Sequence, residues 1–146
     1  MATKNKIDCQ FCNKPAQLVD GTVVYPHRPD LKRLNFWFCD KGHDAAYVGC
    51  HKPNCGYGDG TRPLGTLANI ELRYERKRAH EAFDWIWREG MMKRTEAYIW
   101  LAHGLGIEDV KRDCHIAMFD ADQCRRAVKL CAEHFDLQTH AVKVMI

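Results

Sequence analysis

Four residues near the start of the chain have the types and spacing of zinc ligands. Cys9 and Cys12 form a Cys-x2-Cys pair, and Cys39 and His43 form a Cys-x3-His pair. Thiolate and imidazole groups are preferred ligands of Zn²⁺, and a structural zinc is held by four of them in a tetrahedron. Two short-spaced pairs on facing turns can supply this geometry without strain. The pattern therefore predicts one structural zinc per chain, ligated by Cys9, Cys12, Cys39 and His43.

Spacing alone leaves the fourth zinc ligand open. His43 ends a tight turn after Cys39, and Gly42 just before it permits a sharp reversal of the backbone. We therefore favour His43, and Cys50 and Cys55 are the alternates. Four protein ligands leave no open position for a reacting water, and the chain lacks the His-x-Glu and Pro-Cys-x2-Cys motifs of zinc deaminases. The sequence thus favours a non-enzymatic protein over an enzyme.

Strands and turns are expected around these ligands. Residues 34–38 form an aromatic, extended run that leads into Cys39, and residues 45–49 are expected to be the strand that leaves the second ligand pair. Asp20 and Gly21 separate two short apolar runs, which predicts a hairpin with a two-residue loop. Knuckle, hairpin, strand, knuckle and strand is the order of elements in a zinc ribbon.

The sequence predicts an α+β protein in two modules. Glycines and Pro63 punctuate residues 56–65 and mark the boundary between them. The first module, residues 5–65, is the zinc ribbon. The second, residues 66–146, is helical, with one long helix and two or three shorter ones. We expect the ribbon to pack against the helical part as one compact unit.

Punctuating residues set the expected helix ends in the second module. Thr66 is the expected N-cap of the long helix, which ends before Gly90. Gly104 is expected to stop the second helix, and Asp120 with Gln123 resembles a capping box at the start of the last. The expected ranges are 67–89, 96–103, a short helix and turn within 107–119, and 121–135.

Composition and charge limit the classes of protein that fit. The chain has 146 residues, 46% of them hydrophobic, with eight cysteines and a net charge of +3. No apolar run approaches the roughly 18 residues that span a bilayer, and the first residues lack the apolar stretch of a secretory signal. We therefore expect a cytoplasmic protein with reduced thiols, in the host cell if a phage encodes it.

The long predicted helix has a basic side. Residues 1–94 carry 16 Lys and Arg against 11 Asp and Glu, so a polyanion is expected to meet this part of the chain. At about 100° per residue, one arc of this helix holds Arg73, Arg76, Lys77 and His80, and the other side holds the apolar residues Leu72, Ala79, Ala82, Phe83 and Ile86. The predicted nucleic-acid-binding residues are Arg62, Arg73, Arg76, Lys77 and His80. A solvated helix face with no partner is the alternative interpretation.

The remaining thiols and imidazoles of the C-terminal half lack the paired spacing of a metal knuckle. We interpret the thiols as buried groups on helix faces and not as parts of a second metal site. The residues concerned are Cys114, His115, Cys124, Cys131 and His134.

Five short motifs occur in order between residues 9 and 131: CQFC at 9–12, AYVGCH at 46–51, TRPLGTLAN at 61–69, AYIWLA at 97–102 and CHIAMFD at 114–120. Together they resemble a family found in phages and prophages and described as a zinc-finger-containing domain of unknown function. Members of that family typically have a second Cys-x2-Cys where this chain has Cys39 and His43, and they lack the insertion around residues 53–56. The resemblance implies a small phage-type zinc protein and brings no established activity.

The sequence leads to two hypotheses about function. The first is a small, non-enzymatic zinc protein of phage origin that contacts nucleic acid through its basic face. The alternative is a protein-binding module that docks on a host protein and inhibits or redirects it. Ribbon modules serve both uses, so the fold does not decide between them.

Overall fold

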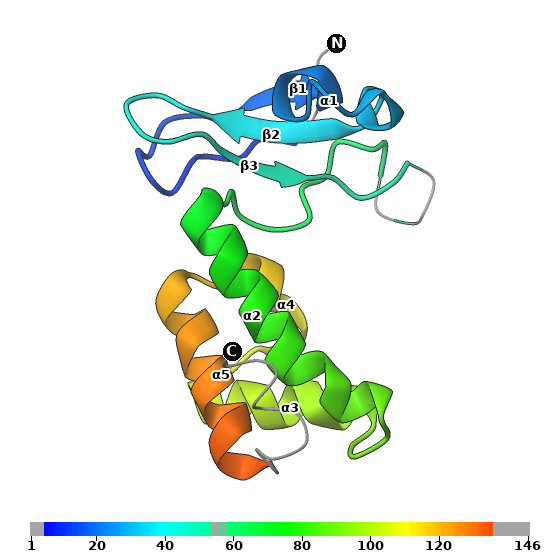
Figure 1. The fold of residues 1–146 in the computed structure, drawn as a ribbon, viewed down its shortest axis with the longest axis vertical. Helices are drawn as coiled ribbons and strands as arrows, with labels where there is room; N and C mark the ends of the chain where they lie inside the picture. Colours follow the sequence, from blue (N-terminus) through cyan, green and yellow to red (C-terminus); the bar gives the residue numbers. More distant parts are fainter. Residues whose placement is uncertain (1–4, 54–55, 57, 136–146) are drawn as a thin grey trace. The chain divides into compact units, whose positions relative to one another are not determined.

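The computed structural model describes residues 5–53, 56 and 58–135. The chain divides into two compact units, an N-terminal unit, Met1–Ile70, and a helical unit, Glu71–Ile146 (Figure 1). A three-stranded antiparallel sheet lies in the first unit and helices make up the second, which confirms the predicted α+β class. No helix among the described residues combines the length and apolarity that crossing a membrane requires.

The sheet of the N-terminal unit has the strand order β1-β2-β3, with β1 at Gln17–Asp20, β2 at Asn35–Cys39 and β3 at Ala46–Gly49. The strands predicted at 34–38 and 45–49 are therefore confirmed. Successive side chains of a strand point to opposite faces, so each strand contributes to two surfaces. The inner face holds a small core, to which Cys9 and Leu67 add from outside the sheet. Its buried members are Cys9, Trp37, Cys39, Ala46, Val48 and Leu67.

The hairpin predicted at Asp20-Gly21 is wrong. Residues Gly21–Val24 form a one-turn helix, α1, because the Asp20 carboxylate caps it and accepts from the Thr22 N–H at 2.9 Å. Gly21 is buried, and a Cβ there would overlap the carbonyl of Leu31. After the 3-10 turn η1, Pro29–Leu31, the chain returns as β2 and pairs with β1. A local cap and a close backbone contact thus replace the expected loop.

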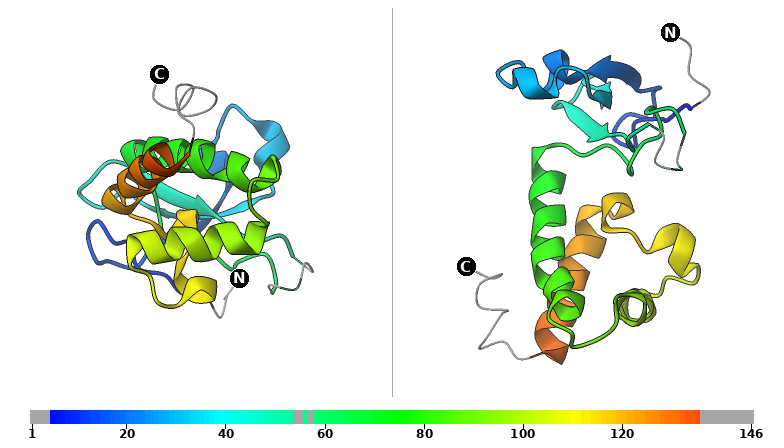
Figure 2. Two further views of the ribbon diagram at one scale, coloured as in Figure 1. Left: turned by 90° about the horizontal axis from the view of Figure 1, so that it is seen from below. Right: turned by 90° about the vertical axis from the view of Figure 1, so that its right-hand side faces the viewer.

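The helical unit is built from α2, α3 and α5 with two short turns between them. The bounds are Ile70–Arg88 for α2, Arg94–Leu105 for α3, Val110–Asp113 for α4, Ile116–Met118 for the 3-10 turn η2 and Ala121–His134 for α5. Helices α2 and α5 lie side by side and α3 runs across them (Figure 2). They share one apolar core that includes Phe83, Ile86, Leu101 and Phe119. The short helix and turn expected within 107–119 are confirmed as α4 and η2.

Two predicted helix ends are wrong, each because of a contact with a distant segment. Thr66 does not cap α2, since Ala68 still exchanges two backbone hydrogen bonds with Tyr47, at 2.9 and 3.0 Å, and the helix begins only at Ile70. Gly104 lies inside α3, where a Cβ would collide with Leu130 of α5. Gly106, with a φ of 74°, ends the helix instead.

The start of α5 forms as predicted. The Gln123 N–H donates to the Asp120 carboxylate at 2.8 Å, and the Asp120 N–H donates to the Gln123 side chain at 3.0 Å, which completes the capping box. The stripe expected on this helix is buried in the core of the helical unit: Cys124, Ala127, Val128 and Cys131. Both signals are local in sequence.

Candidate metal centre

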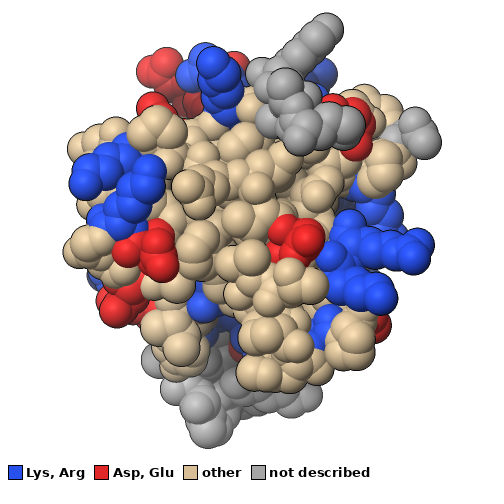
Figure 3. Space-filling view, turned by 90° about the horizontal axis from the view of Figure 1, so that it is seen from above, with Lys and Arg blue, Asp and Glu red and all other residues tan. Residues whose placement is uncertain are grey.

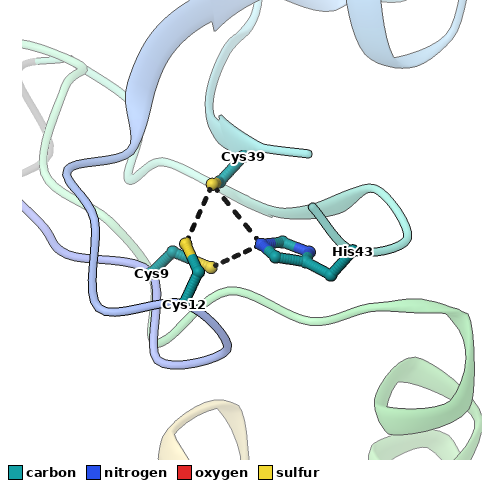
Figure 4. A group of neighbouring side chains, drawn as sticks. All are labelled: Cys9, Cys12, Cys39 and His43. Carbon is teal, nitrogen blue, oxygen red and sulfur yellow. Dashed lines mark hydrogen bonds between the residues drawn. The ribbon is translucent and has the colours of Figure 1, made fainter. Parts of the chain in front are cut away.

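The first ligand pair lies on a tight turn before β1. The Cys9 N–H donates to the carbonyl of Lys14 at 2.8 Å, and the Asn13 N–H donates to the carbonyl of Cys9 at 2.7 Å. Asn13 has a left-handed φ of 60°, a conformation that asparagine adopts more readily than most residues. The turn brings the side chains of Cys9 and Cys12 toward the second ligand pair (Figure 4).

The second ligand pair is held by the sheet. Cys39 is the last residue of β2 and pairs with Ala46, the first residue of β3. The loop between them must therefore reverse the chain, and Gly42 assists with a left-handed φ of 80°. His43 lies in this loop, so the reversal that joins the two strands also returns its imidazole to Cys39.

The four predicted ligands come together in space. Their ligand atoms all lie within 4.8 Å of one another. The sulfurs of Cys12 and Cys39 are 3.6 Å apart, and the His43 Nε2 lies 3.4 Å from the sulfur of Cys9 and 3.5 Å from that of Cys39 (Figure 4). A tetrahedral zinc at ordinary bond lengths places two sulfurs about 3.8 Å apart and a sulfur and a nitrogen about 3.6 Å apart. The cluster therefore fits zinc.

A second hydrogen bond orients the imidazole of His43. The Nδ1–H donates to the backbone carbonyl of Asp44 at 2.7 Å, which leaves Nε2 as the nitrogen that faces the thiols. This bond, together with the nearby Cys12 and Cys39, raises the pKa of His43 to about 9. The ring of Phe11 lies against the imidazole, with 5.8 Å between ring centroids. The side chain is thus held with Nε2 toward the thiols, and a metal that binds there displaces the proton from this nitrogen.

The thiols of the first pair are not equivalent. Burial raises the pKa of Cys9 to about 11. Burial also opposes ionisation of Cys12, but hydrogen bonds from the Lys14 backbone and from its cluster neighbours, His43 first, outweigh it and lower its pKa to about 7. Since zinc binds thiolate and neutral imidazole, binding the metal releases protons from this cluster.

The alternate ligand Cys50 does not belong to the cluster. Cys50 is half-buried beyond the end of β3, where it pairs with Pro63, and burial raises its pKa to about 11. Cys55 lies outside the residues that the structure describes. The ligand set that the structure gathers is therefore Cys9, Cys12, Cys39 and His43, and it is consistent with one structural zinc. Cys9 and Cys39 are almost fully buried, as in closed structural sites.

The predicted nucleic-acid-binding residues do not all lie on one exposed surface. Arg62, Lys77 and His80 are exposed, and Arg73 is half-buried. Arg76 is only 8% exposed, and its Nε–H donates to the backbone carbonyl of Phe119 at 3.1 Å. Burial lowers the pKa of this guanidinium. The prediction that Arg76 joins an exposed basic arc is therefore wrong.

The periodicity of α2 explains the burial of Arg76. It follows Leu72 by four residues and precedes Ala79 by three, so it shares the stripe that faces the core of the helical unit. The helical spacing of Leu72, Arg76 and Ala79, at i, i+4 and i+7, is enough to predict the burial of Arg76 from the sequence. The other apolar residues expected on this side are buried as predicted: Leu72, Ala79, Ala82, Phe83 and Ile86.

The remaining described thiols are buried in the helical unit, as interpreted from the sequence. Burial raises the pKa of Cys114 and Cys124 to about 11 and that of Cys131 to about 12. Among residues 5–53, 56 and 58–135, His, Cys, Asp and Glu groups gather with metal-binding spacing only at the cluster already described. These thiols therefore act as small apolar core residues.

One candidate surface was not predicted from the sequence. Phe36 and Phe38 are two residues apart in β2 and therefore point to the same face of the sheet, opposite the face that carries Cys39. Tyr47, paired with Phe38 across the strands, adds a third aromatic ring to it. The spacing of Phe36 and Phe38 indicates from sequence that both rings lie on one face of the strand. The register with β3 is needed to show that Tyr47 lies beside them.

Comparison with known proteins identifies the family. A family model described as a zinc-finger-containing domain matches residues 5–134, which include all four residues of the cluster. No curated protein and no solved structure matches the chain. The metal-binding geometry and this match over most of the chain agree. The protein belongs to the family of zinc-finger-containing domain proteins.

Proposed function

We propose that this zinc-binding protein contacts nucleic acid through its N-terminal unit. The observation that supports the proposal most is the distribution of charge between the two units. Residues 1–70 carry nine Lys and Arg against six Asp and Glu, whereas residues 71–146 carry thirteen of each kind. The excess positive charge of the chain therefore belongs to the unit that the zinc stabilises, and a polyanion is attracted there first.

Three exposed cations of the N-terminal unit lie at the end of the sheet where β2 begins, and Lys41 lies at the opposite end. Lys32 and Arg33 precede β2, separated from it by Leu34. Arg62 lies at the same end, because its carbonyl accepts from the His51 N–H at 2.9 Å just beyond β3. Arg28 adds little, since its guanidinium is paired with Asp30 at 2.8 Å. In the proposal, Lys32, Arg33 and Arg62 contact phosphates.

Helix α2 has a smaller role than the sequence predicts. Arg76 is buried, and the His80 imidazole bonds the Asp84 carboxylate at 3.1 Å. Lys77 remains exposed and Arg73 half-buried. We retain Lys77 as an additional phosphate contact and no longer include Arg76.

Salt dependence tests the proposal. A labelled oligonucleotide is expected to bind the zinc-loaded protein at low ionic strength and to dissociate steeply as salt rises, since each phosphate contact adds about 0.7 to 0.9 to the logarithmic slope. The double variant Lys32→Glu, Arg33→Glu is expected to lose most of the affinity. Lys111→Glu, Lys129→Glu makes the same change of charge on exposed residues of the helical unit and is the control.

The alternative hypothesis predicts different results. A protein-docking module binds its partner through packed apolar contacts, so its complex tolerates salt and the two charge-reversal pairs have similar effects. If single-stranded and double-stranded DNA and RNA all fail to bind at low ionic strength, the nucleic-acid proposal is wrong. Phage origin, which the resemblance in sequence implies, is part of the proposal and predicts phage genes beside the gene for this protein.

A further inference from the structure

The face of the sheet opposite the zinc ligands is aromatic. This outer sheet face consists of Gln17 and Val19 from β1, Phe36 and Phe38 from β2, and Tyr47 and Gly49 from β3. The register arranges them in two rows across the strands, Val19–Phe36–Gly49 and Gln17–Phe38–Tyr47. Side chains paired directly across strands lie about 4.5 to 5.5 Å apart at Cβ, so Phe38 and Tyr47 form one continuous surface.

The first row is covered by other parts of the N-terminal unit. Phe36 is only 7% exposed, and the ring of Tyr25 stands edge-on to it with 5.6 Å between centroids. Leu64 lies over Gly49, because a Cβ at that glycine would come within 3.5 Å of its side chain. This row is therefore a second small core and not a binding surface.

The second row is open and is held in position by the first. Phe38 and Tyr47 are half-buried, and Gln17 is exposed. The hydroxyl of Tyr47 donates to that of Tyr25 at 3.1 Å, and their rings are 5.6 Å apart and nearly perpendicular. Since Tyr47 packs on Tyr25 and on Phe36 of the covered row, its ring is ordered before any partner arrives, which lowers the entropic cost of binding.

Charge indicates the kind of partner that fits this face. None of the six residues of the outer sheet face is charged. In the space-filling view from above, Lys and Arg side chains gather at the left and right of the surface, with Asp and Glu side chains among them (Figure 3). The open row lies toward the end of β2 that leads into Cys39, whereas Lys32 and Arg33 lie before the other end of the same strand, beyond the covered row. Aromatic rings and cations spaced along one strand in this way complement a chain with flat apolar groups and regularly spaced negative charges. Single-stranded nucleic acid has this composition, whereas the bases of a duplex are already stacked on one another.

We infer that the outer sheet face is a stacking platform for single-stranded DNA or RNA, with bases on Phe38 and Tyr47 and phosphates toward Lys32 and Arg33. The inference rests on the proposed nucleic-acid contact and specifies the form of nucleic acid that takes part. Every base has an aromatic face, so the platform is expected to bind with little sequence preference.

The test compares bases with the backbone that carries them. The probes are a labelled oligothymidylate, an abasic oligonucleotide of the same length and charge, and a duplex, each titrated into the full zinc-loaded chain at low ionic strength. Stacking of one base typically changes affinity by about five- to a hundredfold, so the oligothymidylate is expected to bind at least about fivefold tighter than the abasic strand. It is also expected to bind tighter than the duplex.

Variants then locate the platform. Phe38→Leu keeps an apolar side chain but removes one of the two rings, and is expected to weaken binding of the oligothymidylate by about fivefold or more without affecting the abasic strand. Phe38→Tyr restores a ring and is expected to restore binding. Tyr74→Leu removes a ring that is 61% exposed on α2 and is the control, with no expected change. Zinc content and circular dichroism verify that each variant is folded.

The outcomes separate this inference from the proposal on which it rests. Equal binding of the oligothymidylate and the abasic strand, with steep salt dependence, overturns stacking but leaves the phosphate contact intact. Tighter binding of the duplex overturns it as well. If no probe binds, both proposals are wrong. If Phe38→Leu does not fold, the comparison of oligothymidylate, abasic strand and duplex on the unaltered protein still tests whether bases stack on it.

Discussion

The two units of this protein are stabilised in different ways. The N-terminal unit buries six residues in its main cluster, and two of them, Cys9 and Cys39, are zinc ligands. The helical unit buries fifteen residues in one cluster that contains no gathered metal ligands among the residues described. The two units are of similar length, so the difference lies in the size of the core, and the metal replaces the apolar burial that the smaller core of the first unit lacks.

The difference teaches where binding function can reside. In the helical unit, most large apolar side chains of α2, α3 and α5 are used for packing, and even Arg76 is drawn into the interior. In the N-terminal unit, the metal stabilises one face of the sheet, so the opposite face keeps Phe38 and Tyr47 half-exposed. The sheet face that does not carry the zinc ligands can thus keep two neighbouring aromatic side chains partly exposed.

The largest expected effect comes from removing one zinc ligand. Cys12→Ser is expected to lose the metal and unfold the N-terminal unit, because zinc binding in small modules supplies about 10 to 16 kcal/mol. The helical unit is expected to stay folded. Zinc content per chain and a two-dimensional NMR spectrum measure both effects, the latter by selective loss of dispersed signals from residues of the sheet.

Cys50→Ser is the matched control for that change. Cys50 is a half-buried thiol in the same unit that does not belong to the cluster, so this variant is expected to keep one zinc per chain. Loss of zinc from Cys50→Ser, or full retention in Cys12→Ser, would contradict the ligand set and remove the basis of the comparison between the units.

A smaller effect is expected from a cavity in the helical unit. Phe83 is fully buried among α2, α3 and α5 and packs on Tyr98 with 4.9 Å between ring centroids. Phe83→Ala is expected to lower the free energy of unfolding of this unit by about 3 to 5 kcal/mol, measured by urea denaturation. Zinc content is expected to remain unchanged. Metal loss from this variant would show that the stability of the N-terminal unit depends on the core of the helical unit.

Arg76 and Lys77 are neighbours with opposite predicted behaviour. Arg76→Met is expected to cost about 1 to 3 kcal/mol, because it leaves the buried carbonyl of Phe119 without its donor. Lys77→Met is expected to cost less than about 0.5 kcal/mol, as exposed substitutions usually do, and to weaken oligonucleotide binding slightly. Urea denaturation and a binding titration check both. A reversed order of the two stabilities would place Arg76 at the surface.

The smallest expected effect is that of Gly104→Ala, and its sign tells whether glycine is required at this position in α3. Gly104→Ala is expected to destabilise the helical unit by about 1 kcal/mol, because the added methyl meets Leu130 where α3 and α5 approach closely. If no close contact required a glycine at position 104, alanine would stabilise α3 by up to about 1 kcal/mol through its higher helix propensity. Thermal unfolding of the variant decides, and the double variant with Leu130→Ala is expected to remove the clash.

Much of the fold and of the zinc site follows from short-range signals. The two ligand pairs, the capping box of α5 and the strands beside Cys39 each depend on residues a few positions apart, and all of them form as predicted. The predictions that are wrong concern residues whose partners are distant in sequence. Gly21 meets Leu31, Ala68 bonds to Tyr47 and Gly104 meets Leu130.

The sequence by itself determined that this protein has a Cys-and-His metal site, because ligand type and the spacing of each pair are local properties of the chain. Only the tertiary structure decided that His43, and not Cys50, lies with Cys39 at the site, and that Phe36 is covered while Phe38 and Tyr47 remain partly exposed. The physical reason is that burial depends on which segments pack together. Side chains alternate along a short strand, but which of its two faces is buried depends on the strands and segments that pack on it.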